Sequence, residues 1–247
     1  MQEEFSLDME GEEDEDEIVC LDESFFINDN YQLTNFTFGS QVIQLFCLHS
    51  ASTDYDLTGQ LVWPGAMLLN NYLSKNSEML QGCSVIELGS GVGITGILCS
   101  RFCHDFVLTD HNDEVLKILK KNIELHASPE NPNCCTGLVA EKLEWGNIDQ
   151  INQILQNYSG GFDLVLGADI CFQQSSIPLL YDTVKHLLQI RGKGRCKFIL
   201  AYVSRAKIMD SLVINEAIRH GMEITEVAGT RSVVGNLDGT IFEITLQ

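Results

Sequence analysis

The residues best suited to chemistry in this chain are a cluster of glycines and the acid that precedes it. Residues 85–93 read Val-Ile-Glu-Leu-Gly-Ser-Gly-Val-Gly, so an apolar run with Glu87 near its end enters a glycine turn. A strand that leads into a glycine turn and then a helix forms a cradle for a nucleotide-type ligand, because glycine allows positive φ and a close approach of the backbone. A carboxylate repels phosphate, so Glu87 suits a ligand that carries an ammonium group or hydroxyls.

Two ligand classes fit this loop. Gly91, Gly93 and Gly96 match the Gly-x-Gly-x-x-Gly pattern of dinucleotide-binding folds, which is a weak signal alone. The other frame, Glu87-x-Gly89-x-Gly91-x-Gly93, starts at the strand end and includes the acid. This frame resembles the first motif of the class I, seven-β-strand methyltransferases. We favour it because it accounts for the acid and for the position of the third glycine.

A second carboxylate follows the next apolar run. Residues 106–109 are β-prone and lead directly to Asp110. This acid lies about 20 residues beyond the glycine loop, where a carboxylate can bind ribose hydroxyls. The alternative is that Asp110 caps the following helix, but Asn112 and Asp113 are better placed as caps. We therefore interpret Asp110 as a ribose-binding residue.

Alternating strands and helices must position these residues. Helical spacing is clearest in 113–126, where Val115, Ile118, Leu119 and Ile123 recur at intervals of three and four. The alternation predicts an α/β fold, a Rossmann-like doubly wound and mostly parallel seven-stranded sheet with helices on both faces. The last two strands leave no room for a helix between them, so we expect an antiparallel C-terminal strand pair. The expected strands are 84–88, 106–109, 137–143, 162–167, 197–203, 223–228 and 240–246, and the expected helices are 64–73, 94–102, 113–126, 177–189 and 207–220.

The N-terminal part differs in composition from the rest. Residues 1–23 are rich in acids and poor in apolar side chains, which predicts a disordered acidic tail. Residues 24–247 are expected to form one domain with an N-terminal β-hairpin extension at about 31–50. The formal net charge is −20, and no lysine or arginine precedes Lys75. This deficit of basic residues argues against nucleic-acid binding and favours a partner with a basic surface.

The cysteines and the hydropathy indicate a compartment. The nine cysteines are an odd number and include no Cys-x-x-Cys pair, so we expect free thiols in a reducing environment and no metal site. No apolar run approaches the ~18 residues of a transmembrane helix, and no secretory signal pattern opens the chain. The expectation is a cytoplasmic protein, with the nucleus as an alternative, that does not bind membranes.

Taken in order, five motifs resemble those of the seven-β-strand protein-lysine methyltransferases that carry an Asp-x-x-Tyr motif. The motifs are Thr58-Gly59-x-x-Val62-Trp63, Val85–Gly93, Leu108-Thr109-Asp110, Leu143-Glu144-Trp145-Gly146 and Asp163-Leu164-Val165-Leu166-Gly167-Ala168-Asp169. The match runs from about residue 35 to the end of the sequence. The resemblance implies a class I methyltransferase fold, S-adenosyl-L-methionine as cofactor, and methyl transfer by a monomer to a lysine side chain of a non-histone protein.

The resemblance also implies roles for individual residues. Trp63 would help to close the cofactor pocket, Asp110 would bind the ribose, and Trp145 would pack against the adenine. Asp169 would orient the acceptor amine and stabilise the positive charge that develops on it, but an aspartate of ordinary pKa is too weak to be the sole base. The residues assigned to the cofactor are Trp63, Glu87, Gly89, Ser90, Gly91, Gly93, Asp110, His111, Trp145 and Ala168.

The chain departs from the family pattern at one important position. The segment after the fourth strand reads Asp169-Ile-Cys-Phe172, so the aromatic ring of the motif is kept and its hydroxyl is lost. We assign Phe172 to the catalytic site together with Asp169. Because of this change, two alternatives stay open: a catalytically weak or inactive binding module with the same fold, and a methyltransferase that acts on a small molecule.

Overall fold

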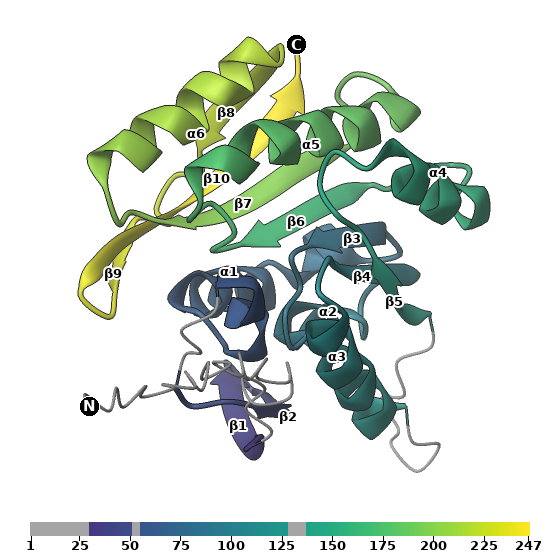
Figure 1. Ribbon diagram of the computed structural model, residues 1–247, viewed down its shortest axis with the longest axis vertical. Helices are drawn as coiled ribbons and strands as arrows, with labels where there is room; N and C mark the ends of the chain where they lie inside the picture. Colours follow the sequence, from purple (N-terminus) through teal and green to yellow (C-terminus); the bar gives the residue numbers. More distant parts are fainter. Residues whose placement is uncertain (1–29, 51–54, 128–136) are drawn as a thin grey trace, which may run out of the picture.

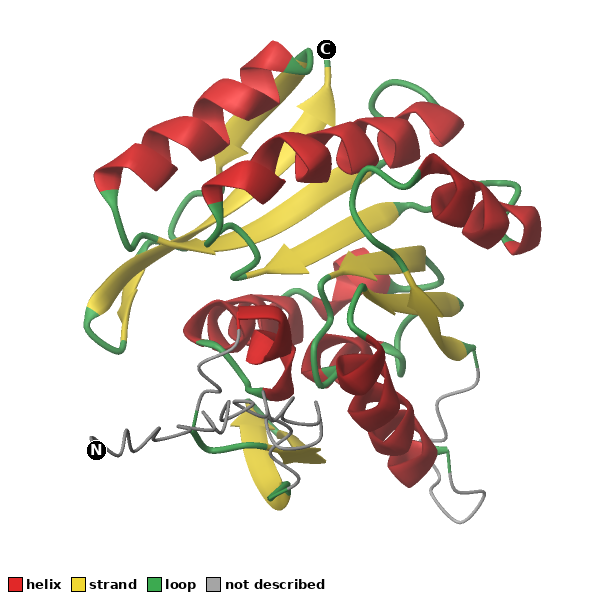
Figure 2. Cartoon of the chain, viewed as in Figure 1, coloured by secondary structure: helices red, strands yellow, loops and turns green. Residues whose placement is uncertain are grey.

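The computed structural model describes residues 30–50, 55–127 and 137–247, and the expected acidic tail at 1–23 lies outside these ranges. A large sheet lies between two layers of helices, and a separate β-hairpin lies beside one of these layers (Figure 1, Figure 2). Within the described ranges, no helix is long and apolar enough to cross a membrane.

Five parallel strands form the larger part of the sheet, in the order β5-β4-β3-β6-β7. The chain enters the sheet at its middle strand, adds strands toward one edge and then returns to add strands on the other side. This reversal of direction lies between β3 and β6, where ligands of open α/β sheets bind. The strands are β3 (Ser84–Leu88), β4 (Asp105–Asp110), β5 (Leu138–Lys142), β6 (Leu164–Ala168) and β7 (Lys197–Val203).

Helices cover both faces of the sheet (Figure 1). Val85 of β3 belongs to the apolar cluster shared with the first three helices, whereas the adjacent Ile86 belongs to the cluster shared with the other three. Successive residues of a strand point to opposite faces, so β3 is buried on both sides. The helices are α1 (Pro64–Lys75), α2 (Ile94–Cys99) and α3 (Asp113–His126) on one face, and α4 (Ile148–Asn157), α5 (Ile177–Arg191) and α6 (Lys207–Arg219) on the other.

The C-terminal strands complete the sheet in antiparallel fashion. The long strand β10 (Leu237–Leu246) pairs with β7 on one side and with β8 (Met222–Glu226) on the other. The predicted α/β sheet of seven strands with an antiparallel C-terminal pair is therefore confirmed. A short additional strand, β9 (Ser232–Val234), pairs with the start of β10 and was not predicted.

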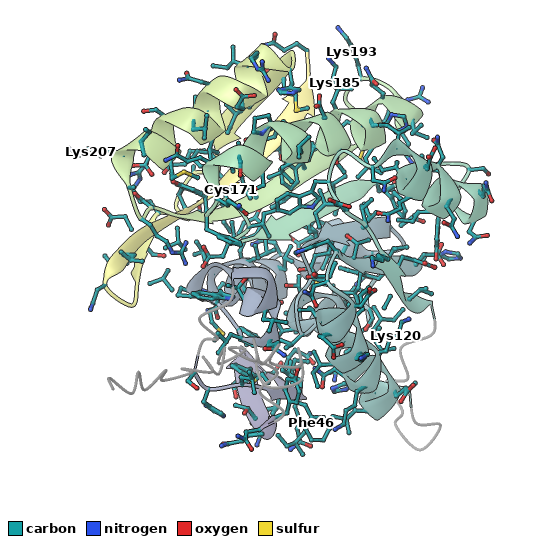
Figure 3. All side chains as sticks on the ribbon, viewed as in Figure 1. Phe46, Lys120, Cys171, Lys185, Lys193 and Lys207 are labelled. Carbon is teal, nitrogen blue, oxygen red and sulfur yellow. The ribbon has the colours of Figure 1, made fainter. Side chains whose placement is uncertain are left out.

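The predicted N-terminal hairpin is formed by β1 (Gln32–Phe38) and β2 (Gln41–Cys47). Asn122 of α3 fastens it to the domain. Its side-chain oxygen accepts from the Phe46 N–H at 2.8 Å, and its amide donates to the carbonyls of Phe46 and Val92, both at 2.9 Å. Figure 3 shows Phe46 on the hairpin and Lys120 on the neighbouring α3. One buried amide thus joins the hairpin, α3 and the loop that follows β3.

The helices differ from the prediction at two points. The helix expected at 94–102 ends at Cys99, because Ser100 to Phe102 turn the chain back toward β4. The helix α4 was not predicted. It begins after Asn147, whose side chain accepts from the Gln150 N–H at 3.1 Å, and it buries Ile151 and Ile154.

Candidate functional site

A cavity of about 330 Å³ lies at the carboxyl ends of β3, β4 and β6. This is the place where open α/β sheets bind ligands, and the volume is in the range of small-molecule sites. The 3-10 turn η2 (Tyr55–Gln60) and the start of α1 complete its wall. Eleven of the twelve site residues expected from the sequence line the cavity, namely Trp63, Glu87, Gly89, Ser90, Gly91, Asp110, His111, Trp145, Ala168, Asp169 and Phe172.

Gly93 is the expected cofactor residue that does not line the cavity. It precedes α2 with φ of 87°, and a Cβ at this position would lie 2.4 Å from Leu119 Cδ1. The absence of a side chain therefore allows α3 to pack against the glycine loop. Gly93 therefore has a packing role in this structure, and its contact with the cofactor stays a prediction.

Gly91 allows the glycine loop to meet η2. Its φ is 53°, and a Cβ there would lie 2.6 Å from the Gly59 carbonyl oxygen. The same loop is fastened to β4, because the Ser90 N–H donates to the Thr109 carbonyl at 2.8 Å and the Thr109 N–H donates to Ser90 Oγ at 3.0 Å. These contacts fix the path of the backbone before any ligand arrives.

Glu87 is a buried acid with one unpaired oxygen. Its side chain is almost inaccessible, with 2% of the residue exposed, and Oε2 has no hydrogen-bond partner among the described residues. Burial raises the pKa of Glu87 to about 7, against hydrogen bonds from Thr95 and Ser90 that lower it. An unpaired buried acceptor costs about 1–3 kcal/mol. A ligand with an N–H or O–H donor would remove this cost.

Asp110 is held firmly at the end of β4. Its Oδ2 accepts from the Gly91 N–H at 3.1 Å, and its Oδ1 accepts from the Asn112 N–H at 3.2 Å. Asn112 is the cap of α3, because its own side chain accepts from the N–H groups of Glu114 and Val115. Asp110 is thus not needed as a cap. Each of its oxygens keeps a lone pair for a further donor.

His111 lines the cavity next to this acid. Its Nδ1 lies 3.5 Å from Asp110 Oδ1, and its side chain is half exposed. No group of three or more His, Cys, Asp or Glu side chains could hold a metal ion in the part of the chain that the structure describes.

The two tryptophans lie on different walls of the cavity. The Trp63 ring N–H donates to the Thr58 carbonyl at 2.7 Å, which fixes the indole between η2 and α1. Trp145 lies over the glycine loop, because a Cβ on Gly89 would be only 3.6 Å from its Cζ2. Both rings are partly buried. They therefore present flat apolar surfaces that a ring system can stack against.

Asp169 stands directly after β6 in an unusual conformation. Its φ is 60°, the only positive φ of a non-glycine residue among those described. Its N–H donates to the Ala201 carbonyl at 2.9 Å, and its Oδ2 accepts from the Gly65 N–H at 3.0 Å. A Cβ on Gly65 would lie 2.7 Å from Asp169 Cβ. The start of α1 and the end of β6 are therefore in direct contact at this residue.

Arg205 is the partner of Asp169, a pairing that the sequence did not indicate. Its two terminal nitrogens donate to the two carboxylate oxygens, with 2.9 Å between Nη2 and Oδ2. Its Cζ lies 5.7 Å from the Trp63 ring centroid. The pairing follows from topology, because β6 and β7 are neighbours and both residues come after the carboxyl ends of these strands.

Phe172 lines the cavity with 42% of its surface exposed. Tyr181 lies on α5 and Tyr202 on β7, and neither lines the cavity. The Tyr202 hydroxyl donates to Asp210 Oδ1 at 2.7 Å, and Tyr181 is a fully buried residue of α5. No described tyrosine therefore replaces the hydroxyl that is absent at Phe172.

The sequence was compared with family models and with known proteins. A model described as lysine methyltransferase matches residues 48–215. The protein N-lysine methyltransferase METTL21A of Mus musculus is 33% identical over 159 residues, which are 63% of this chain and 65% of the relative. The EEF1A lysine methyltransferase 3 of Mus musculus is 34% identical over 153 residues, 60% of each chain.

A fungal relative is similar to the same extent. The protein N-terminal and lysine N-methyltransferase EFM7 of Yarrowia lipolytica is 31% identical over 168 residues, which are 62% of this chain and 60% of the relative. The chain thus spans 60 to 65% of the length of these curated relatives.

Among solved structures, a magnesium protoporphyrin IX methyltransferase (ChlM) from Synechocystis PCC 6803 with bound SAM has a TM-score of 0.51 and 11% sequence identity. The match covers 74% of this chain and 78% of that one. At this identity the likeness concerns the fold alone. The family model matches well over half of the chain, and so this protein belongs to the lysine methyltransferase family.

Proposed function

We propose that this protein is an S-adenosyl-L-methionine-dependent protein-lysine N-methyltransferase. The observation that carries the proposal is the buried Glu87 oxygen without a partner, beside a glycine loop in a cavity at the strand ends. Membership of the lysine methyltransferase family and the names of the curated relatives support the same reaction.

The residues present fit this cofactor. Glu87 Oε2 is a buried acceptor for an ammonium group, and Asp110 has free lone pairs for ribose hydroxyls. The Trp145 ring over the glycine loop offers a surface for a purine. When bound, S-adenosylmethionine supplies a methyl group on a positively charged sulfur, which keeps the electron pair of the bond that breaks. The protein's part is to hold and orient the ligand.

The acceptor side of the site is formed by other residues of the same cavity. Ala168 is the last residue of β6, and Asp169 and Phe172 follow it. Trp63, just before α1, and Arg205, just after β7, line the same cavity. These side chains would exclude water and align the acceptor nitrogen. Such alignment is worth several orders of magnitude in rate.

We further propose that the acceptor is a non-histone protein with a basic or lysine-bearing surface, and that the enzyme acts as a monomer. The net charge of −20 supports a basic partner and disfavours nucleic acid. The cytoplasm is the proposed compartment, with the nucleus as the alternative. Six cysteines within the described ranges are free thiols, which is typical of reducing compartments.

The test is incubation of the purified protein with tritiated S-adenosylmethionine and a methylation-depleted cell extract, resolved on a gel. We expect a labelled protein band whose hydrolysate contains methylated lysine. Asp110→Asn should lose the label. Asp149→Asn, an exposed position in the first turn of α4, should keep it and serves as the matched control.

Each other outcome contradicts a defined part of the proposal. A label on the α-amino group of the acceptor would reject lysine as the target and keep protein methylation. No label, with calorimetry still showing binding of S-adenosylhomocysteine, would favour a small-molecule acceptor or a binding module. In that case Phe172→Tyr, which restores the hydroxyl of the family motif, is the first variant to assay.

A further inference from the structure

The charge balance of the cavity depends on a single arginine. The titratable side chains in the cavity wall, within the described part of the chain, are Glu87, Asp110, His111, Asp169 and Arg205. Arg205 is the one permanent cation of this set. Its side chain is 31% exposed, whereas that of Asp169 is 2% exposed. The carboxylate is therefore almost removed from water, and the guanidinium remains at the border of the cavity.

The groups packed behind this pair supply no second cation. On the β7 and α6 side, the hydroxyls of Tyr202 and Ser204 donate to Asp210 at 2.7 and 3.0 Å. After β6, burial and the charge of Asp169 raise the pKa of the Cys171 thiol, so it stays neutral; Figure 3 shows this residue near the centre of the molecule. From α1, the contact with Asp169 is the uncharged N–H of Gly65. Among the described residues, Arg205 is therefore the cation that compensates the carboxylate.

Three donors already occupy the carboxylate of Asp169. Two come from Arg205 and one from the Gly65 backbone. An ionised carboxylate offers about four acceptor positions, so one remains for a neutral N–H group. An acceptor that arrived as an ammonium ion would instead have to compete with a bidentate guanidinium, which is the stronger partner for a carboxylate.

This arrangement bears on the protonation of the acceptor, and the inference rests on the proposed function. A lysine ammonium has no lone pair and must release a proton to water before it can take a methyl group. An unpaired carboxylate a few ångströms away would favour the charged ammonium and raise its pKa. We propose that Arg205 is a positioning residue that neutralises Asp169, so that the site receives the acceptor lysine as an uncharged amine.

Trp63 helps to hold the guanidinium in this position. The Arg205 Cζ lies 5.7 Å from the indole centroid, within the range of a cation–π contact. The indole is itself fixed by its bond to the Thr58 carbonyl. A lysine at position 205 would keep the charge but would lose the planar two-point contact and the stacking. Charge and geometry can therefore be separated by substitution.

The experiment measures kcat and KM against pH with tritiated S-adenosylmethionine and the protein that is labelled in the extract, after its purification. Arg205→Gln keeps hydrogen-bond donors but removes the charge, and Arg205→Lys keeps the charge. We expect Arg205→Gln to shift the acidic limb of the kcat profile toward higher pH, by about one pH unit or more. At neutral pH, kcat then falls about tenfold for each unit, while KM stays constant or decreases. Arg205→Lys lowers kcat but leaves the limb in place.

Two further variants separate charge from structure. Arg205→Gln combined with Asp169→Asn removes both charges, so the acidic limb should return toward its wild-type position. Arg231→Gln is the matched control, because Arg231 also binds a carboxylate with two nitrogens, that of Glu226, outside the cavity. It should leave the profile unchanged. Binding of S-adenosylhomocysteine, measured by calorimetry, identifies any variant whose cavity has collapsed.

The outcomes that contradict the inference are distinct from those that contradict the proposed function. If wild-type protein transfers label but Arg205→Gln keeps the wild-type profile, the role of Arg205 is wrong and the methyltransferase remains. The same holds if Arg205→Lys shifts the limb as far as Arg205→Gln does, or if the double variant keeps the full shift. If wild-type protein labels no protein at all, the proposed function fails and this role fails with it.

Discussion

Replacement of Glu87 by glutamine should remove a pH dependence of the folding stability. Burial raises the pKa of this carboxyl from 4.5 to about 7. Between these values the folded protein holds a proton on Glu87 that the unfolded chain has already released, so the free energy of unfolding falls as pH rises through this window. At about 1.36 kcal/mol per pKa unit, the complete loss is about 3 kcal/mol.

The assay is urea unfolding of the ligand-free protein at several pH values between about 5 and 8. Other titrating groups contribute equally to wild type and variant, so the difference between their unfolding free energies isolates Glu87. This difference should shift by most of the expected ~3 kcal/mol across the window, in favour of the variant at high pH. Glu124→Gln, on an exposed position of α3, should keep the wild-type dependence. Parallel curves of unfolding free energy against pH for wild type and Glu87→Gln would refute the raised pKa of the buried Glu87 carboxyl.

Three other predictions concern the same part of the molecule. Asp110→Asn should weaken S-adenosylhomocysteine binding by roughly 10- to 100-fold in calorimetry, because charge-assisted hydrogen bonds contribute about 1.5–3 kcal/mol. Gly91→Ala should lower thermal stability more than Gly229→Ala. Both glycines have positive φ, but a Cβ would lie 2.6 Å from the Gly59 carbonyl oxygen at position 91 and would meet open space at position 229. Equal losses of stability would contradict the contact with Gly59. Asn122→Ala should cost about 1–3 kcal/mol and increase amide exchange in β1 and β2, because it removes two of the hydrogen bonds that join the hairpin to α3.

The fold was largely predictable because its signals are local. The strand at 197–203 and the start of the helix at 113 were placed correctly, the latter because Asn112 is a cap in both sequence and structure. The helix α4 was missed although Asn147 caps it and Ile151 and Ile154 recur at helical spacing. It is short and rich in Asn and Gln, so its apolar signal is weak. The three-residue β9 exists only through pairing with β10, which no local pattern encodes.

The candidate site was predictable to the level of single strand ends. Glu87, Asp110 and Asp169 each follow an apolar run, and parallel strands bring such ends together. The pairing of Asp169 with Arg205 required knowledge that β6 and β7 are neighbours. The separation of Gly93 from the cavity required the position of Leu119, a residue on another helix. Contacts between distant segments were thus the part that the pattern of residues could not supply.

The position of β10 between β7 and β8 has a consequence for how the chain folds. β10 fills the space between β7 and β8, and in the described part of the chain β8 joins the sheet through β10 alone. During synthesis, β7 therefore keeps an unpaired edge, and β8 stays outside the sheet, until residues 237–246 have emerged. Unpaired edges of this kind favour association with other chains. The sheet is thus closed only after residues 237–246 have been synthesised, and the time until then determines how long the β7 edge is exposed to aggregation and in need of chaperones.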